Sequence, residues 1–139
     1  MKLSHVAALT FVFGSCVICV GAEQETSHKP SNVLFSTALK DVPGKQMVVV
    51  GLEFKRKGSQ PAVPHRHPGS VYVYVTRGTA RLAIAGQPVQ EVHTGESFFE
   101  PPGALHTVAE SASETDSAAA IAVLIVPAGA PLLTVEPTK

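Results

Sequence analysis

Short runs in which polar and apolar residues alternate follow one another along most of this chain of 139 residues. Alternation predicts a strand with one buried face, because successive side chains of a strand point to opposite sides. In VYVYVT at 71–76, the valines are predicted to point inward and the tyrosines outward. Turn residues end the runs at short intervals without a helical period, which predicts a single all-β domain, a sandwich or barrel. The predicted strands are 33–39, 47–54, 71–76, 79–85, 89–93, 97–100, 105–109 and 118–126.

Three connections complete this predicted layout. The dipeptide Arg77-Gly78 lies between two β-prone runs and predicts a hairpin. The segment 109–120 is rich in Ser, Ala and acidic residues and predicts an exposed loop, and a Pro-rich tail begins at Pro127. On the predicted strand 79–85, the side chains of Ala80, Leu82 and Ile84 are expected to point inward.

The amino terminus predicts a secretory signal peptide. Lys2 supplies the positive charge, Val6 to Val20 is apolar, and the small residues before Glu23 favour cleavage after Ala22. The alternatives are a membrane anchor, although a span needs about 20 apolar residues, and a lipoprotein with Cys16 as acceptor. We therefore expect an exported protein, periplasmic or secreted, with no membrane contact in its mature form. The expected organisation is a signal peptide (1–22), a flexible lead-in (23–31), a β-barrel domain (32–135) and a tail (136–139).

Removal of the signal would change the cysteine content and the charge. Both cysteines, Cys16 and Cys19, would leave, so the mature chain would have no disulfide and no thiolate ligand or nucleophile. Loss of Lys2 leaves 10 of the 11 basic residues against 11 acidic ones, a net charge near −1. This balance gives no reason to expect nucleic acid or an anionic membrane as partner. The basic run 55–57 precedes Gly58, and a solvated turn is expected there rather than a binding patch.

Histidines supply the candidate chemistry. His65 and His67 stand two residues apart, between Pro64 and Pro68, which disfavour a helix. In an extended chain both imidazoles face the same side, with Arg66 on the other. A third histidine from another strand, His106, would complete one face of a site for a first-row transition metal.

These residues resemble the two motifs of the cupin superfamily, small jelly-roll barrels with a metal inside. The first motif pairs HxH with a Glu three or four residues later and then a Gly; here it is HRHPGSVYVYVTRG, with Gly78 at the place of that glycine. The second motif is a Gly, five residues, PxG, two residues and a His. Gly95, Pro101, Gly103 and His106 match it without a gap. The resemblance implies a single-domain jelly-roll fold and an internal metal, and a homodimer through an outer sheet face.

One departure concerns the metal ligands. The Glu of the first motif should stand at 71 or 72, where this chain has Val71 and Tyr72. Either the three histidines hold the metal alone, or Glu100 substitutes as fourth ligand or as a general base. The resemblance implies that position 100, just before the PPG turn, faces the barrel, where cupins commonly carry an apolar residue. A buried lone carboxylate is costly unless it is paired or bound to metal, which favours Glu100 near the metal. The alternative places Glu100 outside, bridging to Arg66 or Arg81.

The function that this resemblance implies is a metal-dependent enzyme acting on a small molecule, a dioxygenase of the quercetinase or thiol dioxygenase kind. His65, His67 and His106, with Glu100, would hold one divalent metal, and Fe, Mn, Ni, Cu and Zn all suit imidazole. A lyase or isomerase would need the same residues. A non-catalytic cupin that binds a ligand or a metal is the second hypothesis. His93 is expected at the surface.

Overall fold

A computed structural model describes residues 32–61 and 63–137, and these residues form strands without helices. No helix in these ranges is long and apolar enough to cross a membrane. The predicted signal peptide and lead-in lie outside the described residues, so export stays a prediction. The strands are β1 (Val33–Ala38), β2 (Lys45–Phe54), β3 (His65–Arg66), β4 (Ser70–Arg77), β5 (Thr79–Ile84), β6 (Gln90–His93), β7 (Ser97–Glu100), β8 (Leu105–Ser111), β9 (Ala118–Pro127) and β10 (Thr134–Val135).

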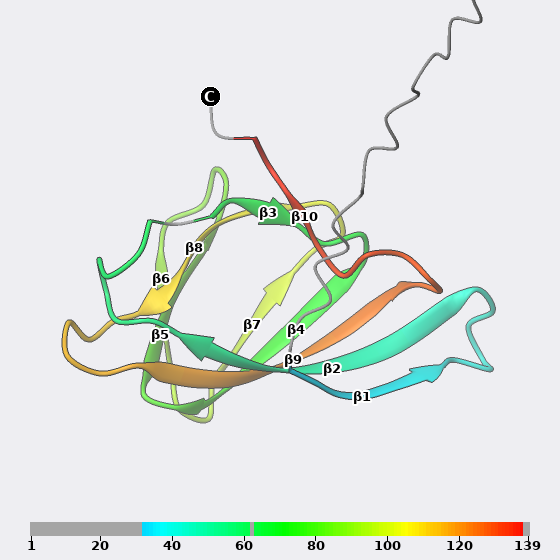
Figure 1. Ribbon diagram of the computed structural model, residues 1–139, viewed down its shortest axis with the longest axis horizontal. Helices are drawn as coiled ribbons and strands as arrows, with labels where there is room; N and C mark the ends of the chain where they lie inside the picture. Colours follow the sequence, from blue (N-terminus) through cyan, green and yellow to red (C-terminus); the bar gives the residue numbers. More distant parts are fainter. Residues whose placement is uncertain (1–31, 62, 138–139) are drawn as a thin grey trace, which may run out of the picture.

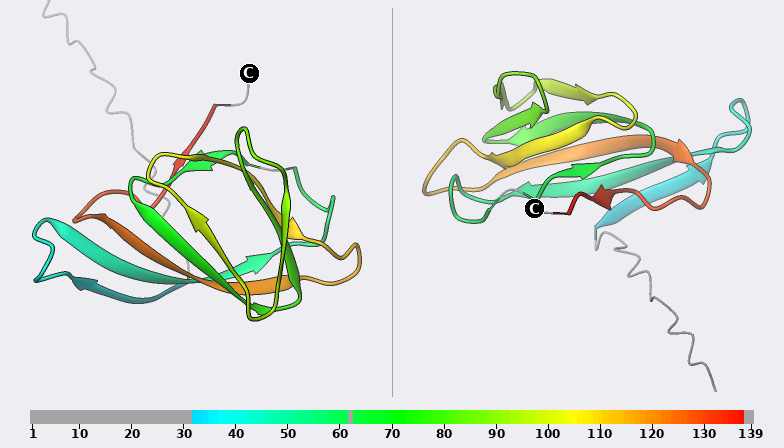
Figure 2. Two further views of the ribbon diagram at one scale, coloured as in Figure 1. Left: turned by 180° about the vertical axis from the view of Figure 1, so that it is seen from behind. Right: turned by 90° about the horizontal axis from the view of Figure 1, so that it is seen from above.

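Two five-stranded antiparallel sheets face each other (Figure 1). The first has the order β1-β2-β9-β4-β7 and the second β10-β3-β8-β5-β6. The β1–β2 hairpin extends beyond the second sheet, as both views of Figure 2 show. The predicted all-β, jelly-roll class is confirmed.

Alternating strand residues fill the space between the sheets. The valines of β4 are at most 1% exposed, whereas Tyr72 and Tyr74 face outward, as the alternation predicts. On β9 every second residue from Ala118 to Val126 is buried. The predicted inward set of β5 is buried as well, namely Ala80, Leu82 and Ile84. The core therefore consists mainly of aliphatic side chains from both sheets, together with Phe54 and Phe98.

The predicted hairpin at Arg77-Gly78 is wrong. β4 pairs with β7 and β9, whereas β5 pairs with β6 and β8, so the two strands belong to opposite sheets. Gly78 has φ +73°, and a Cβ there would lie 3.2 Å from the Cβ of Ala118. A tight corner between sheets needs a glycine for the same reason as a hairpin does, namely a positive φ. The dipeptide alone cannot distinguish the two.

Two short strands and one loop also differ from the prediction. β3 and β10 pair with each other through only two residues each, which is too short to give an alternating pattern. β10 lies in the segment predicted as a Pro-rich tail. β8 extends to Ser111 and β9 begins at Ala118, so the loop predicted at 109–120 is confined to 112–117.

Candidate metal centre

Three histidines meet because two neighbouring strands carry them in register. β3 pairs with β8, and His65 lies directly opposite His106. His67 follows two residues after His65, on the same side of the extended chain. The ring centroid of His65 lies 4.9 Å from that of His67 and 5.0 Å from that of His106. One nitrogen of each ring lies within 4.8 Å of the others, so these rings could hold one metal ion.

Backbone carbonyls orient two of the three rings. The Nδ1–H of His65 donates to the carbonyl of Val63 over 2.9 Å. The Nδ1–H of His67 donates to the carbonyl of Leu132 over 2.6 Å. A neutral imidazole that donates through Nδ1 keeps the lone pair of Nε2 for a metal, and such outer contacts raise the basicity of a ligand. Both rings therefore have the orientation of metal ligands.

Glu100 lies inside the barrel beside the histidines. Its side chain is 3% exposed, and its Oε2 is 3.4 Å from Nδ1 of His106 and 3.7 Å from Nε2 of His67. The alternative with Glu100 outside is wrong, because Arg66 pairs with Glu136 and Arg81 pairs with Glu110. Glu100 comes from β7, in the sheet opposite the one that carries the histidines.

The register of β7 explains how Glu100 reaches the site. Val71 on β4 lies directly opposite Glu100, and both are buried on the same inner face. Directly opposed residues of an antiparallel pair have Cβ atoms about 5 Å apart. Position 71 is one of the two at which the cupin resemblance places a glutamate. The carboxylate therefore enters the same region of the barrel from the adjacent strand.

Burial shifts the ionisation of this cluster in opposite directions. It raises the pKa of Glu100 to about 7. Burial, together with the charges of His65 and His67, lowers the pKa of His106 to about 4. Burial also lowers the pKa of His67, against the hydrogen bond from the ring to Leu132. Metal ligands must be neutral imidazoles and ionised carboxylates. His67 and His106 are thus neutral at pH 7, whereas a nearby cation would be needed to keep Glu100 fully ionised.

The unsatisfied atoms of the site fit a bound metal. Within the described chain, Oε2 of Glu100 and both ring nitrogens of His106 are buried without a hydrogen-bond partner. Buried polar atoms without partners are rare in proteins, and each calls for a bound group or a functional reason. The three imidazoles are donors for a first-row transition metal, and the carboxylate of Glu100 adjoins two of them.

A small inner cavity of about 200 Å³ adjoins the four residues. Phe98 is buried and its ring stacks on that of His106 at a centroid distance of 6.1 Å, but it does not line the cavity; Phe99 on the same strand is exposed. The other side chains that line the cavity are aliphatic or aromatic: Val50, Leu52, Phe54, Val71, Val73, Ala109, Ala122, Leu124, Leu132 and Leu133. Such walls exclude water from all but the polar cluster.

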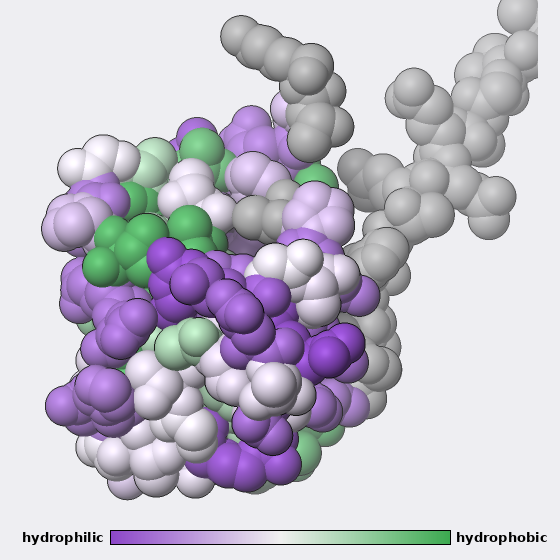
Figure 3. Space-filling model, turned by 90° about the vertical axis from the view of Figure 1, so that its left-hand side faces the viewer, coloured by the Kyte–Doolittle hydropathy of each residue, from purple (hydrophilic) through white to green (hydrophobic). Residues whose placement is uncertain are grey.

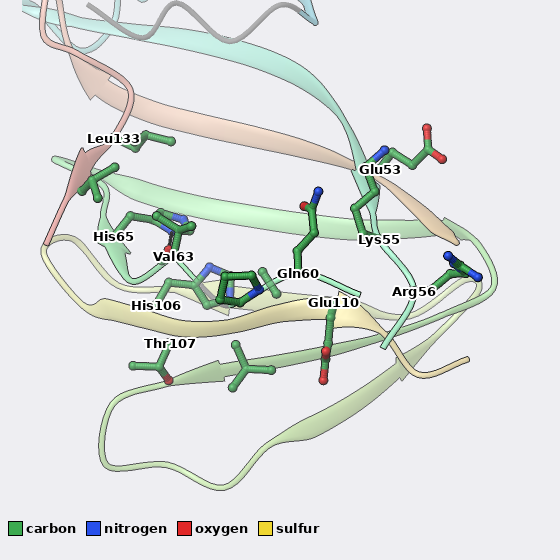
Figure 4. Close-up of a pocket in the computed structure, with 14 residues that line it drawn as sticks. Glu53, Lys55, Arg56, Gln60, Val63, His65, His106, Thr107, Glu110 and Leu133 are labelled. Atoms are coloured by element: carbon green, nitrogen blue, oxygen red, sulfur yellow. Dashed lines mark hydrogen bonds between the residues drawn. The ribbon is translucent and has the colours of Figure 1, made fainter. Parts of the chain in front are cut away.

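A larger groove of about 520 Å³ lies outside this cavity, and His65 and His106 line both (Figure 4). Ala109 and Leu133 are also shared by the two linings. Because the two spaces meet at these four side chains, the groove is the approach from the surface to the histidines.

Arg66 links the segments that carry the site. From β3 it makes an ion pair with Glu136, and its Nη1 donates to the carbonyl of Gly103 over 2.6 Å. The N–H of Gly103 donates in turn to the carbonyl of His67 over 2.9 Å. The HRH segment, the turn before His106 and the C-terminal segment are therefore joined around one side chain.

Sequence reasoning missed these supporting contacts. The carbonyl of Leu132 belongs to a segment predicted as a tail, and no sequence pattern marks a backbone acceptor. The spacing of His65 and His67 in an extended segment did predict that Arg66 faces away from the histidines. Among the other residues considered, His93 lies at the surface and contacts Thr79, and the carboxylate of Glu96 accepts a hydrogen bond within its own turn.

The family comparison agrees with this geometry. The model of the Cupin domain matches residues 52–130, more than half of the chain. The chain belongs to the cupin family. No curated protein matches the sequence.

Solved structures share the fold of this cupin. An uncharacterized conserved protein with a double-stranded β-helix domain from Klebsiella pneumoniae subsp. pneumoniae MGH 78578 is 20% identical, with 76% of this chain and 82% of that chain covered and a TM-score of 0.54. A cupin-like protein from Thermotoga maritima MSB8 is 19% identical, with 74% and 75% covered and a TM-score of 0.52. FeII HppE in complex with substrate is 24% identical, with 63% and 49% covered and a TM-score of 0.50. The fold thus occurs in a metalloprotein that binds a substrate.

Proposed function

We propose that this cupin is a metal-dependent enzyme that acts on a small molecule, a dioxygenase of the quercetinase or thiol dioxygenase kind. His65, His67, His106 and Glu100 would hold one divalent transition metal. The observation that carries the proposal is the buried carboxylate of Glu100, which has no hydrogen-bond partner for Oε2 among the described residues and faces two imidazoles. A bound ferrous ion would supply open positions for substrate and oxygen together.

The protein groups have distinct roles in this proposal. Nε2 of His65 and of His67 point inward because their Nδ1 atoms are engaged by backbone carbonyls. If Glu100 is not a ligand, its carboxylate, whose pKa is raised to about 7 by burial, would instead act as the general base that accepts a proton from a substrate near neutral pH. The aliphatic walls of the inner cavity keep water away from this proton transfer.

Chemistry is favoured over a purely binding role by the accessibility of the site. A closed set of ligands would suit a structural metal, whereas catalytic sites keep an open side. His65 is only half-buried and lines the surface groove. A lyase or isomerase would use the same residues with the metal as a Lewis acid.

The test is metal content followed by turnover. The full chain is loaded with iron, manganese, nickel, copper or zinc in turn, and substrate panels are screened for oxygen uptake. Oxygen consumption that requires one metal and is abolished in Glu100→Ala supports the dioxygenase. Turnover without oxygen consumption supports a lyase or isomerase. Stoichiometric metal without turnover of any substrate favours the binding module.

We also propose a homodimer through the outer face of the first sheet. Five residues in register cross all five strands of this face: Phe35, Val49, Val123, Tyr72 and Phe99. The row carries no charge, so an identical face would complement it as an isologous interface.

The exposed aromatic area is on the scale of a dimer interface. Phe35, Tyr72, Tyr74 and Phe99 are 41–55% exposed. Since an aromatic side chain can bury about 200 Å², the four leave on the order of 400 Å². This is about half of the roughly 800 Å² that each partner buries in a standard interface. Light scattering of the Tyr72→Glu variant is expected to report a monomer where the wild type is a dimer. A monomeric wild type contradicts the proposal.

Export remains part of the proposal and rests on the sequence. Amino-terminal sequencing of protein recovered from its native compartment is expected to begin at Glu23. A chain that retains Met1 in the cytoplasm would contradict export.

A further inference from the structure

The outer groove has two chemically different ends. Figure 4 shows Val63, His65 and Leu133 at one end and Lys55 and Arg56 at the other. Val135 also lines the groove beside Leu133 on the C-terminal segment. The groove therefore passes from an apolar end next to the histidines to a charged end at the surface, where Figure 4 also shows Glu53. Figure 3 views the molecule from the side of the loops that follow β2 and β8, where hydrophilic side chains predominate beside a smaller hydrophobic patch.

The two cations are free to bind a ligand. Throughout 32–61 and 63–137, neither Lys55 nor Arg56 makes a side-chain ion pair or hydrogen bond. Two carboxylates also line the groove. Glu110 is neutralised by Arg81 and accepts a hydrogen bond from the N–H of Gly58. Glu53 has no ion-pair or hydrogen-bond partner among the described residues, and Figure 4 shows its carboxylate turned away from the histidines. The free charges, two positive and one negative, leave the groove with an excess of one positive charge.

The backbone that carries the two cations is held in place. The carbonyl of Lys55 accepts from the N–H of Ser111 over 2.8 Å, and the N–H of Lys57 donates to the carbonyl of Ser113 over 2.9 Å. The carbonyl of Arg56 accepts from both the N–H and the hydroxyl of Ser59. The cations therefore stand on an ordered turn fastened to β8 and its following loop. The turn expected at 55–57 is present, and two of its three basic side chains line the groove.

We propose that this groove binds a small organic acid with an apolar body. Its acidic group lies at Lys55 and Arg56, and its apolar part lies against Val63, Leu133 and Val135, next to His65. A volume of about 520 Å³ suits a ligand of this size. The inference rests on the proposed function in one respect, that the groove leads to the reacting centre; the charge and shape of the groove stand without it.

The experiment titrates the metal-free full chain with sodium octanoate and with octanamide, its uncharged match, by isothermal titration calorimetry. Octanoate is expected to bind at least about tenfold more tightly than octanamide, a ratio that falls with added salt. The Lys55→Gln/Arg56→Gln variant is expected to lose that ratio. Glu53→Gln is expected to strengthen octanoate binding several-fold, because the one free negative charge is removed.

The matched control is Lys57→Gln. Lys57 belongs to the same basic run but does not line the groove, so octanoate affinity is expected to stay within twofold of the wild type. Urea midpoints of all variants check that folding is unchanged. Equal binding of octanoate and octanamide, or an equal loss in Lys57→Gln, overturns the inference. So does binding to anionic phospholipid vesicles without binding to free octanoate.

Failure of this inference is separable from failure of the proposed function. The same titration is repeated on His65→Ala/His106→Ala. Octanoate selectivity in a wild type that takes up none of the five metals when they are added supports the groove and contradicts the metalloenzyme. Stoichiometric metal in a wild type without octanoate selectivity contradicts the groove alone.

Discussion

Replacement of Glu100 by glutamine is expected to stabilise the metal-free protein at high pH. Glutamine has nearly the same shape as glutamate but carries no charge. The pKa of Glu100 is about 7 in the folded protein, against 4.5 for the unperturbed group. A difference of about 2.5 pKa units corresponds to about 3 kcal/mol. This is the upper limit of the destabilisation that the ionised carboxylate exerts on the metal-free fold.

The sign follows from proton binding. Below pH 4.5 the carboxyl is protonated in both states and contributes nothing to the difference between wild type and variant. Between pH 4.5 and about 7 the unfolded chain loses its proton first, so the free energy of unfolding of the wild type falls as pH rises. Above pH 7 the loss is complete. His106 acts in the opposite direction, because its lowered pKa removes stability as pH falls from 6.5 to about 4, but both proteins share that contribution.

The assay is urea unfolding of wild type and Glu100→Gln, both treated with chelator, at pH 4.5 and pH 8. The two proteins are expected to agree at pH 4.5, and the variant is expected to exceed the wild type by up to about 3 kcal/mol at pH 8. Added metal should make the wild type more stable than the variant, because the ionised carboxylate then binds a metal ion that binds only the folded state. A variant less stable than the wild type at pH 8 without metal would refute the reasoning, since the carboxylate would then have a stabilising partner.

Three further predictions concern the surroundings of the site. Val71→Glu combined with Glu100→Val is expected to retain metal binding that Glu100→Val alone loses, because the two positions face each other across β4 and β7; metal content measures this, and equal loss in both variants would count against it. Arg66→Ala is expected to speed metal release to a chelator about tenfold, with less than about 1 kcal/mol lost in unfolding because its ion pair is exposed; unchanged release would argue that Arg66 has no positioning role. Gly69→Ala is expected to destabilise by more than about 3 kcal/mol, because its Cβ would lie 1.9 Å from the carbonyl oxygen of Ile125, whereas Gly51→Ala has ordinary contacts and should stay within about 1 kcal/mol. Urea unfolding compares the two, and similar midpoints would contradict the packing argument.

Local patterns predicted which face of each long strand is buried, but they did not predict which strands pair with each other. The alternation of VYVYVT shows which side of β4 is buried, since that depends on the strand alone. The partner of β4 depends on residues far along the chain, so Arg77-Gly78 suggested a hairpin where the chain crosses between sheets. β3 and β10 are too short for any pattern, although the first of them carries His65.

The candidate site was predicted from spacing and from the energetics of burial. The spacing of His65 and His67 places both on one side of an extended segment, and the second motif added His106. The cupin resemblance implied that Glu100 faces the barrel, and the free energy that an unpaired buried carboxylate would require then favoured a position near the metal. Its register with Val71, and the carbonyl of Leu132 behind His67, are properties of tertiary structure that have no sequence signature.

The most direct measurement is elemental analysis of the purified full chain beside the His65→Ala/His106→Ala variant. The account predicts close to one equivalent of a single transition metal in the wild type and almost none in the variant, with both proteins folded by circular dichroism. Absence of metal from a folded wild type that is also unable to take up added iron, manganese, nickel, copper or zinc would contradict the account.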